Sequence, residues 1–354
     1  MLELANNWQQ GGDDISNIKN LWFKKGGVVL KNDLRPLLST LDDLPYPDYD
    51  LFDCAQVLKD RKGDFAVIAS RGCPFSCSNC CNHALREAYK GKGRYFRVPS
   101  VDNVLEQIEL LTKKYPIRSV NFADDVFALS REWALEFCEK YPRRFDLKFK
   151  CNVRADMIDE ELLENLKRAN CTEISMGVET GNEWLRMEVL DRKMPNEQII
   201  NVFDAAHKLG IETLSYNMIG LPYETPEMVE ETINLNKQIA PDHVAVFFFY
   251  PYPGTKLHEI CSKEGFLTRS DSTSYISESI LELPTITAKE LDRLYAKFYR
   301  YAMQREMKSA HWVIRYPFRL IDYAFGRLLT KRVILALMKI YLKFFRIFSL
   351  LRSN

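Results

Sequence analysis

The sequence predicts an α/β fold built on a parallel β-sheet. Between residues 65 and 253, short apolar runs alternate with helix-forming segments, which gives six strand–helix units. The apolar runs are nearly continuous, as is typical of strands that are covered on both faces. Alternation of this kind implies parallel strands joined by right-handed crossovers. Periodicity alone leaves open whether the sheet is an open, doubly wound one or a partly closed barrel.

Local signals mark where the elements begin and end. Ser100 is suited to cap a helix, Pro226 to occupy the first position of another, and Gly210 to end a third. We expect strands over 65–70, 118–123, 147–153, 172–178, 212–220 and 243–253, and helices over 100–115, 131–141, 160–169, 196–210 and 225–239.

Residues outside the alternating region carry other patterns. Paired glycines favour a hairpin over residues 21–30, and two prolines favour an extended linker over 41–52. Thr287 and Glu290 fit a capping box at the start of a further helix that ends near residue 307. The expected regions are an N-terminal remnant and linker (1–62), a core (63–266), a C-terminal helical segment (267–310) and a basic amphipathic tail (311–354).

Composition excludes some classes of protein. The 354 residues are 46% hydrophobic, which is enough for a large core, and the net charge of +1 gives no reason to expect a nucleic-acid partner. The last 44 residues hold nine Lys/Arg and one Asp, so the tail is basic and the rest of the chain is acidic. Nine cysteines, with no secretory signal over residues 1–14, favour the reducing cytoplasm and metal or redox chemistry.

A cysteine motif follows the first expected strand. Cys73, Cys77 and Cys80 have the spacing CxxxCxxC and lie in one loop, where ligands of a parallel sheet or barrel gather. Thiolates hold iron–sulfur clusters, and three of them leave one iron of a cubane cluster free. A structural zinc ion prefers four ligands, and Cys81 or His83 could supply the fourth, which is the main alternative.

This motif, ahead of five more strand–helix units, resembles the radical S-adenosylmethionine (SAM) superfamily over about residues 65–266. The resemblance implies a partial (β/α)6 TIM-like barrel with a C-terminal helical extension. It also implies a [4Fe-4S] cluster whose free iron binds SAM, an external reductant such as a flavodoxin or ferredoxin, and a 5′-deoxyadenosyl radical. One departure is Asn79, which stands where many members carry an aromatic residue near the adenine.

The resemblance also assigns roles to residues that follow the other strands. Asp124 or Asp125 would hold the methionyl amine, Glu179 the ribose hydroxyls, and Arg192 the carboxylate. Turn capping and solvated helix charges are the ordinary explanations of such residues. The complete set of expected cofactor-binding residues is Asp124, Asp125, Arg154, Glu179, Arg192, Ile219, Gly220 and Pro222, the last three lining the adenine. No residue is assigned as catalytic.

The linker and cysteine loop are similar to those of the subgroup with a cobalamin-binding domain, which includes radical methyltransferases and the anaerobic Mg-protoporphyrin ester cyclase type. A doubly wound domain of that kind needs on the order of 100 residues, and only residues 1–27 precede the linker region. Cobalamin is therefore not expected within this chain. The enzyme works without it, a partner supplies it, or the chain is a shortened relative.

The tail carries a further signal. Lys339, Lys343 and Arg346 share one helical face opposite a broad apolar face, which favours a helix lying on the inner surface of a membrane. Docking onto the body or a partner is the alternative. The expected protein is cytoplasmic, or peripheral on that membrane, and acts on a small molecule that is lipid-like. A non-catalytic iron–sulfur or zinc scaffold is the alternative function, and methyl transfer and cyclisation are both open.

Overall fold

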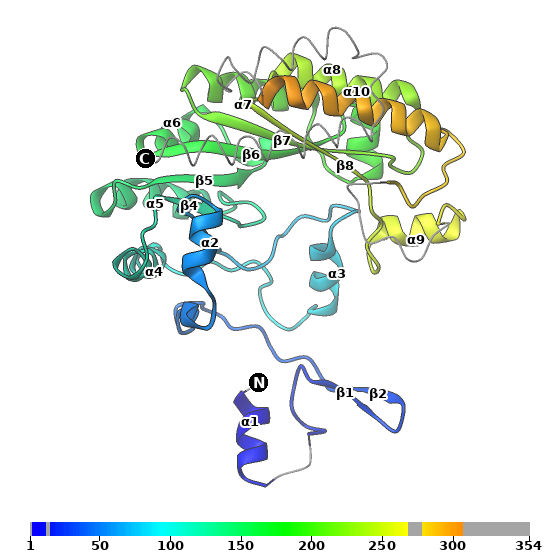
Figure 1. Cartoon of the computed structure of the whole chain (residues 1–354). Coiled ribbons are helices and arrows are strands. Elements are labelled where there is room, and N and C mark those ends of the chain that lie inside the picture. The colour runs from blue at the N-terminus through cyan, green and yellow to red at the C-terminus, as the bar shows by residue number, and fades with distance from the viewer. Residues whose placement is uncertain (1, 12–14, 268–277, 307–354) are drawn as a thin grey trace.

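The computed structural model describes residues 2–11, 15–267 and 278–306. Its centre is a six-stranded parallel sheet in which the strands lie in chain order, from β3 at one edge to β8 at the other. The sheet curls into a half-barrel (Figure 1), so the partial-barrel prediction is confirmed. The strands are β3 (Asp64–Val67), β4 (Ser119–Phe122), β5 (Lys148–Val153), β6 (Cys171–Glu179), β7 (Glu212–Ile219) and β8 (His243–Phe248).

Helices connect successive strands and cover the outer face of the sheet (Figure 1). The last of them, α10, packs along β8 and α8 and so covers the far edge. The connecting helices are α4 (Val101–Lys114), α5 (Arg131–Arg144), α6 (Glu160–Arg168), α7 (Asn196–Lys208) and α8 (Pro226–Ile239), with α10 at Ala288–Glu306.

Side-chain caps explain where these helices begin. The Ser100 hydroxyl accepts from the Asn103 N–H, and Thr225 caps α8 with Pro226 in the first turn. At α10, the Thr287 N–H donates to Glu290 at 3.0 Å, and the Glu290 N–H donates to the Thr287 hydroxyl at 3.2 Å. The reciprocal pair is the predicted capping box. These bonds satisfy N–H groups that a helix leaves unpaired at its start.

Aromatic rings fill the core between β4, β5 and α5. Phe122, Phe137 and Phe149 are fully buried and meet edge to face with centroids 5.2–5.6 Å apart. Such pairs add about 0.5–1.5 kcal/mol to the free energy gained by burying their area. This packing fixes the first half of the sheet, whose carboxyl ends carry the cysteine loop and its neighbours.

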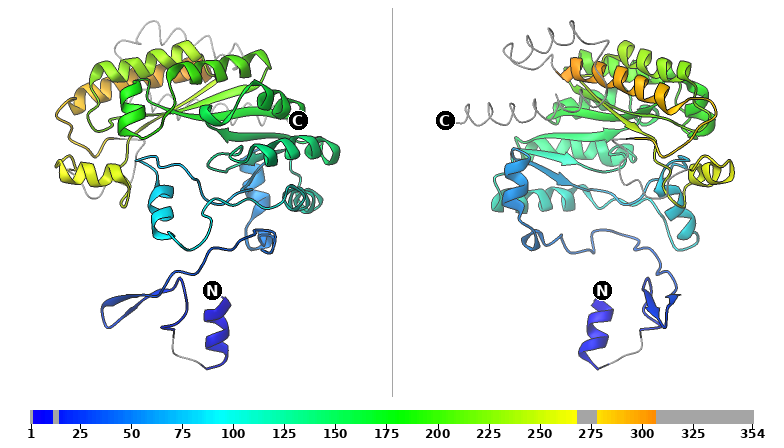
Figure 2. Two further views of the ribbon diagram at one scale, coloured as in Figure 1. Left: turned by 180° about the vertical axis from the view of Figure 1, so that it is seen from behind. Right: turned by 45° about the vertical axis from the view of Figure 1, so that its right-hand side comes forward.

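The N-terminal segment lies away from the sheet in all three views (Figures 1 and 2). It consists of α1 (Leu2–Gln9) and a hairpin of β1 (Trp22–Lys25) and β2 (Val28–Lys31). Gly26 and Gly27 both have positive φ, as the tight hairpin turn requires. The predicted hairpin is confirmed.

Several short elements were not predicted from the sequence. They carry too few residues for a clear periodic signal. They are α2 (Cys54–Asp60), α3 (Cys81–Ala88), α9 (Lys256–Lys263), two 3₁₀ turns (Tyr49–Leu51 and Ala155–Met157) and a π-helical turn (Leu185–Val189).

The basic tail, residues 311–354, lies outside the described residues. Within the described part of the chain, none of the helices combines the length and the apolar character that crossing a bilayer requires.

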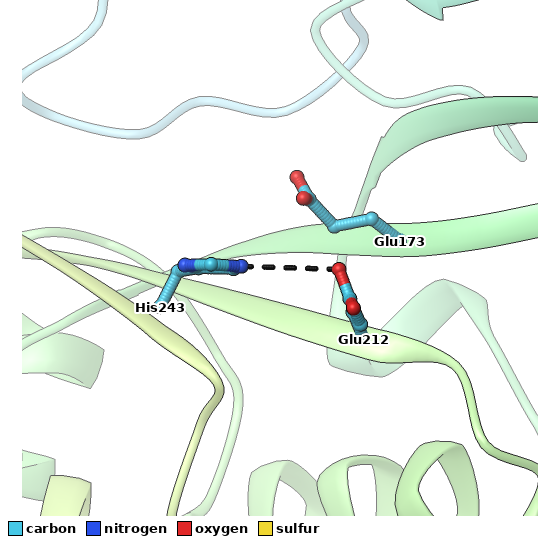
Figure 3. Close-up of side chains that lie close together, drawn as sticks. All are labelled: Glu173, Glu212 and His243. Atoms are coloured by element: carbon cyan, nitrogen blue, oxygen red, sulfur yellow. Dashed lines mark ion pairs between the residues drawn. The ribbon is translucent and has the colours of Figure 1, made fainter. Parts of the chain in front are cut away.

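An ion-pair cluster ties α10 to the inner face of the sheet, where Glu173 (β6), Glu212 (β7) and His243 (β8) lie close together (Figure 3). Nδ1 of His243 lies 2.8 Å from Oε1 of Glu306 in α10, and its Nε2 lies 3.8 Å from Glu212. The hydrogen bond with Glu306 raises the pKa of His243 from 6.5 to about 9, against the effect of burial. The imidazolium therefore balances part of the surrounding negative charge at neutral pH.

We expect stability to fall as pH rises through the titration of His243. Because its pKa is raised on folding, the stabilisation is present in full below pH 6.5 and is lost through pH 9. The ring is 30% exposed, so after screening the effect should be about 2 kcal/mol. Chemical denaturation should show that the parent has the higher free energy of unfolding at pH 6.5, and that its advantage over His243→Gln shrinks as pH rises to 9. Glu306→Gln should reproduce most of this loss, and equal pH slopes in parent and His243→Gln would contradict the assignment.

Candidate active site

A cavity of about 360 Å³ opens at the carboxyl ends of the first strands of the sheet. Strands β3 to β7 or the loops after them supply its wall. Its polar lining combines thiols, carboxylates and guanidinium groups. The lining includes Cys73, Cys77, Asn79, Cys80, Asn82, Asp124, Asp125, Arg154, Gly177, Glu179, Arg192 and Tyr216.

The loop after β3 brings the three predicted cysteines to this wall. Cys73 and Cys77 are buried and Cys80 is half-buried, directly before α3. Burial raises the pKa of Cys73 to about 11 and also raises that of Cys80. Neutral thiols are therefore favoured until a cation compensates the thiolates.

Nitrogen donors surround two of the three sulfurs. Nη1 of Arg154 lies 3.5 Å from the Cys77 sulfur, and Nη1 of Arg192 lies 3.6 Å from the same sulfur. The side-chain amide of Asn82 donates to Cys80 at 3.7 Å. Sequence reasoning missed Asn82, because nothing in its spacing sets it apart from a residue of an ordinary first helical turn.

The two acids after β4 differ in their partners. Asp124 is buried, and its oxygens accept from the Ala69 N–H at 3.1 Å and from the Ser70 hydroxyl. Burial raises its pKa, and the Ser70 bond opposes that rise. Asp125 accepts from Asn82 at 2.9 Å and faces the cysteine loop. Both carboxyl groups reach the cavity, and Asp124 has each oxygen already engaged.

A distortion at the end of β6 aims Glu179 into the cavity. The register of β6 with β7 shifts between Gly177 and Glu179, and Glu179 has a φ of +66°. Bulges of this kind redirect side chains near functional sites. Arg192 lies 3.8 Å from Glu179 and donates to the Gly177 carbonyl at 2.8 Å. Burial raises the pKa of Glu179, and Arg192 counters it.

A fully buried arginine, Arg186, holds this region in place. It donates to the carbonyl oxygens of Val178 and Met194 at 3.2 and 2.9 Å and also bonds the Thr180 carbonyl and Asn196. Burial lowers its pKa to about 10. The π-helical turn carries Arg186 inward. Sequence analysis missed it, since its role depends on carbonyl groups that only the fold brings together.

Ile219, Gly220 and Pro222, which were expected near the adenine, are not among the residues that line this cavity. The Ile219 side chain packs into the outer layer with Val229 and Ile233. Gly220 has a φ of +79°, and a side chain there would come within 3.0 Å of Leu291 in α10. The role of Ile219, Gly220 and Pro222 in cofactor binding therefore stays a prediction.

The carboxylate of Glu224 fixes the turn that contains these residues. It is buried and accepts from the N–H groups of Gly220 and Leu221. Burial raises its pKa to about 8.

Asn79, Cys81 and His83 lie close to Cys80 in the sequence and differ in their surroundings. Asn79, the residue that departs from the family pattern, lies on the cavity and donates to the Met218 sulfur at 3.9 Å. Cys81 is exposed at the start of α3. His83 has a buried Nδ1 with no partner among the described residues.

Comparison with known proteins finds similarity to one family. Residues 67–235 match the model of the radical SAM superfamily. Over these residues the chain is similar to that superfamily. The matched region runs from the end of β3 into α8, and it contains the cysteine loop and both arginines at the Cys77 sulfur.

The curated proteins similar to this chain include two kinds of enzyme. It is 28% identical over 290 residues to an uncharacterized methyltransferase of Pyrococcus horikoshii, covering 81% of this chain and 62% of the relative. It is 23% identical to the anaerobic magnesium-protoporphyrin IX monomethyl ester cyclase of Rubrivivax gelatinosus, covering 82% and 51%. The predicted resemblance to the methyltransferase and cyclase subgroup is confirmed. The chain spans only about half to three fifths of these relatives.

A solved structure supports the fold. The radical SAM methyltransferase TsrM of Kitasatospora setae, with tryptophan substrate and a SAM analogue bound, superposes with a TM-score of 0.67 at 16% identity, covering 84% of this chain and 64% of that one. Another structure of TsrM holds cobalamin and a [4Fe-4S] cluster. At this identity the match concerns architecture alone.

We expect Gly177→Ala to weaken SAM binding by about tenfold, which is about 1.4 kcal/mol. The added Cβ would overlap Oε1 of Glu179 and come within 3.0 Å of Nη2 of Arg192. Equilibrium binding to the cluster-loaded protein measures the effect, and the iron content should be unchanged. Because the shortest contact of the added Cβ is to Glu179, the double variant with Glu179→Gln should lose less affinity than the sum of the two single losses. Additive losses, or loss of iron, would count against this assignment.

Proposed function

We propose that this chain uses a [4Fe-4S] cluster, held by Cys73, Cys77 and Cys80, to cleave SAM reductively and modify a substrate by hydrogen abstraction. The observation that carries the proposal is the meeting of three thiols, two guanidinium groups and three carboxyl groups on one cavity wall. Thiols suit the irons, and the charged groups suit the amino acid end of SAM.

The residues fit a cluster better than a single ion. Around one Zn²⁺, thiolate sulfurs lie about 3.8 Å apart, as Zn–S bonds of about 2.3 Å dictate. Over the described ranges, the one set of three Cys, His, Asp or Glu ligand atoms that all lie within 4.8 Å is Glu173, Glu212 and His243. The three thiol sulfurs therefore do not all lie within 4.8 Å of one another, which suits a cubane in which each binds a different iron.

Two buried polar atoms at the cavity wall have no hydrogen-bond partner within the described part of the chain. They are Nε of Arg192 and Oδ1 of Asn79. A bound SAM would supply an acceptor for the first and a donor for the second, which removes the cost of leaving them unpaired.

When bound, the cluster and SAM supply a 5′-deoxyadenosyl radical. The chain's own groups bind and orient the cosubstrate. Asp125 is the better candidate for the methionyl amine, since both oxygens of Asp124 accept protein donors. Arg192 faces the carboxylate with its free Nε, and Glu179 accepts from the ribose. No side chain is assigned as a catalytic acid or base.

The outcome of the reaction follows from the relatives only as a class. Methyl transfer and cyclisation both remain within the proposal, because the named relatives are a methyltransferase and a ring-forming cyclase. The substrate is proposed to be a small, lipid-like molecule, and the electron to come from a flavodoxin or ferredoxin. If the reaction needs cobalamin, we propose that it binds outside these 354 residues.

Anaerobic reconstitution tests the proposal directly. The reduced protein with SAM should yield 5′-deoxyadenosine, and alanine at any one of Cys73, Cys77 or Cys80 should lower the yield at least about a hundredfold, because each removes a ligand of the cluster. Cys81→Ala is the matched control, since that thiol is exposed in the same segment, and it should retain the yield. A full cluster with intact SAM would favour the scaffold alternative, and stoichiometric zinc without iron would favour a zinc protein.

Membrane attachment is a separate proposal that rests on the sequence of the tail. The basic face of Lys339, Lys343 and Arg346 would contact anionic lipid headgroups. We expect the full chain to float with anionic vesicles and a chain without residues 311–354 to float much less. Equal flotation of the two would remove both this proposal and the hint of a lipid-like substrate.

A further inference from the structure

Arg154 is held in one orientation by contacts on every side. It follows β5 and is 4% exposed. Its Nε and Nη2 donate to the two oxygens of Asp156 at 2.9 and 2.8 Å, and its guanidinium lies 3.6 Å above the ring of Phe75. Phe75 belongs to the cysteine loop, so the arginine is fixed to the segment that carries the three thiols.

The one edge of Arg154 left over by Asp156 faces sulfur. Asp156 already occupies the Nε/Nη2 edge, and on the other edge Nη1 lies 3.5 Å from the Cys77 sulfur. Arg154 is therefore poorly placed to clamp the carboxylate of SAM. Arg192 differs, since its Nε is buried without a partner among the described residues.

Reduction changes the charge beside this arginine. A cubane with three thiolate ligands takes up one electron from the reductant, so its net charge becomes more negative by one unit and no proton or bond needs to change. Hydrogen bonds to cluster sulfurs and nearby cations favour the more negative state and raise the reduction potential. Their effect is large where water is excluded, as at the buried Cys77.

We propose that Arg154 is a positioning residue for the cluster, whose N–H···S contact to Cys77 raises the reduction potential of the cluster rather than binding SAM. The inference rests on the proposed function, because it needs the cluster. Arg154 then acts in the electron-transfer step, and Arg192 and Asp125 bind SAM. Asn82, which donates to Cys80, would act in the same direction.

A redox titration of the reconstituted protein, followed by electron paramagnetic resonance, tests this role. At the parent's midpoint, the ratio of reduced to oxidised cluster in Arg154→Met should fall about tenfold, which is 59 mV for one electron. Arg154→Lys keeps the charge and should recover most of the ratio, whereas Arg154→Gln should recover little. SAM affinity should stay at the parental value in all three variants.

Arg86→Met is the matched control. Arg86 bonds the Pro74 carbonyl and the Ser76 hydroxyl in the same loop, and it should titrate like the parent. If Arg154→Met fails to hold a cluster, the test is the difference in reduction potential between Arg154→Lys and Arg154→Gln. Equal potentials in parent, Lys and Gln variants would overturn the inference, as would loss of SAM affinity at an unchanged potential. Absence of a cluster in the parent would instead overturn the proposed function.

Discussion

The parallel alignment of six strands in chain order is the constraint on which the site depends. Every strand that points the same way delivers its following loop to the same edge of the sheet. The cysteine loop after β3, the acids after β4, Arg154 after β5 and Glu179 at the end of β6 therefore converge on one cavity. The site is a consequence of topology first and of side-chain chemistry second.

Charge compensation then decides how those side chains can coexist. Burial disfavours the charged forms of Glu179, Asp124 and Cys73, whose pKa values are all raised. At Glu179, the guanidinium groups of Arg192 and Arg154 offset part of that cost. Arg186 differs from these two arginines, because it donates its hydrogen bonds mainly to backbone carbonyl oxygens. Burial lowers its pKa to about 10. One buried arginine thus supports the backbone, and the other two face the cavity.

The strand–helix alternation and the cysteine motif were readable from the sequence because both are local patterns. Caps such as Ser100 and the pair Thr287 and Glu290 also depend on neighbours within one turn. Three-dimensional contacts could not be read in this way. Asn82 and Arg186 act through groups that are distant along the chain or are plain backbone, and the ordering of Arg154 by Phe75 requires the two loops to meet. Helices as short as α3 and α9 lack the repeated apolar spacing that would announce them.

The open form of the sheet has a consequence for what the cavity can accept. A closed barrel of eight strands has an interior that its own side chains nearly fill. Here β3 and β8 each pair with a neighbour strand on one side only, within the described part of the chain, so the concave face forms a trough rather than a tube. Tyr216, on the inner face of β7, stays 37% exposed for this reason. A molecule can therefore enter the trough from the side, between the edge strands β3 and β8. The size of a molecule that binds there is not limited by the inner diameter of a closed barrel.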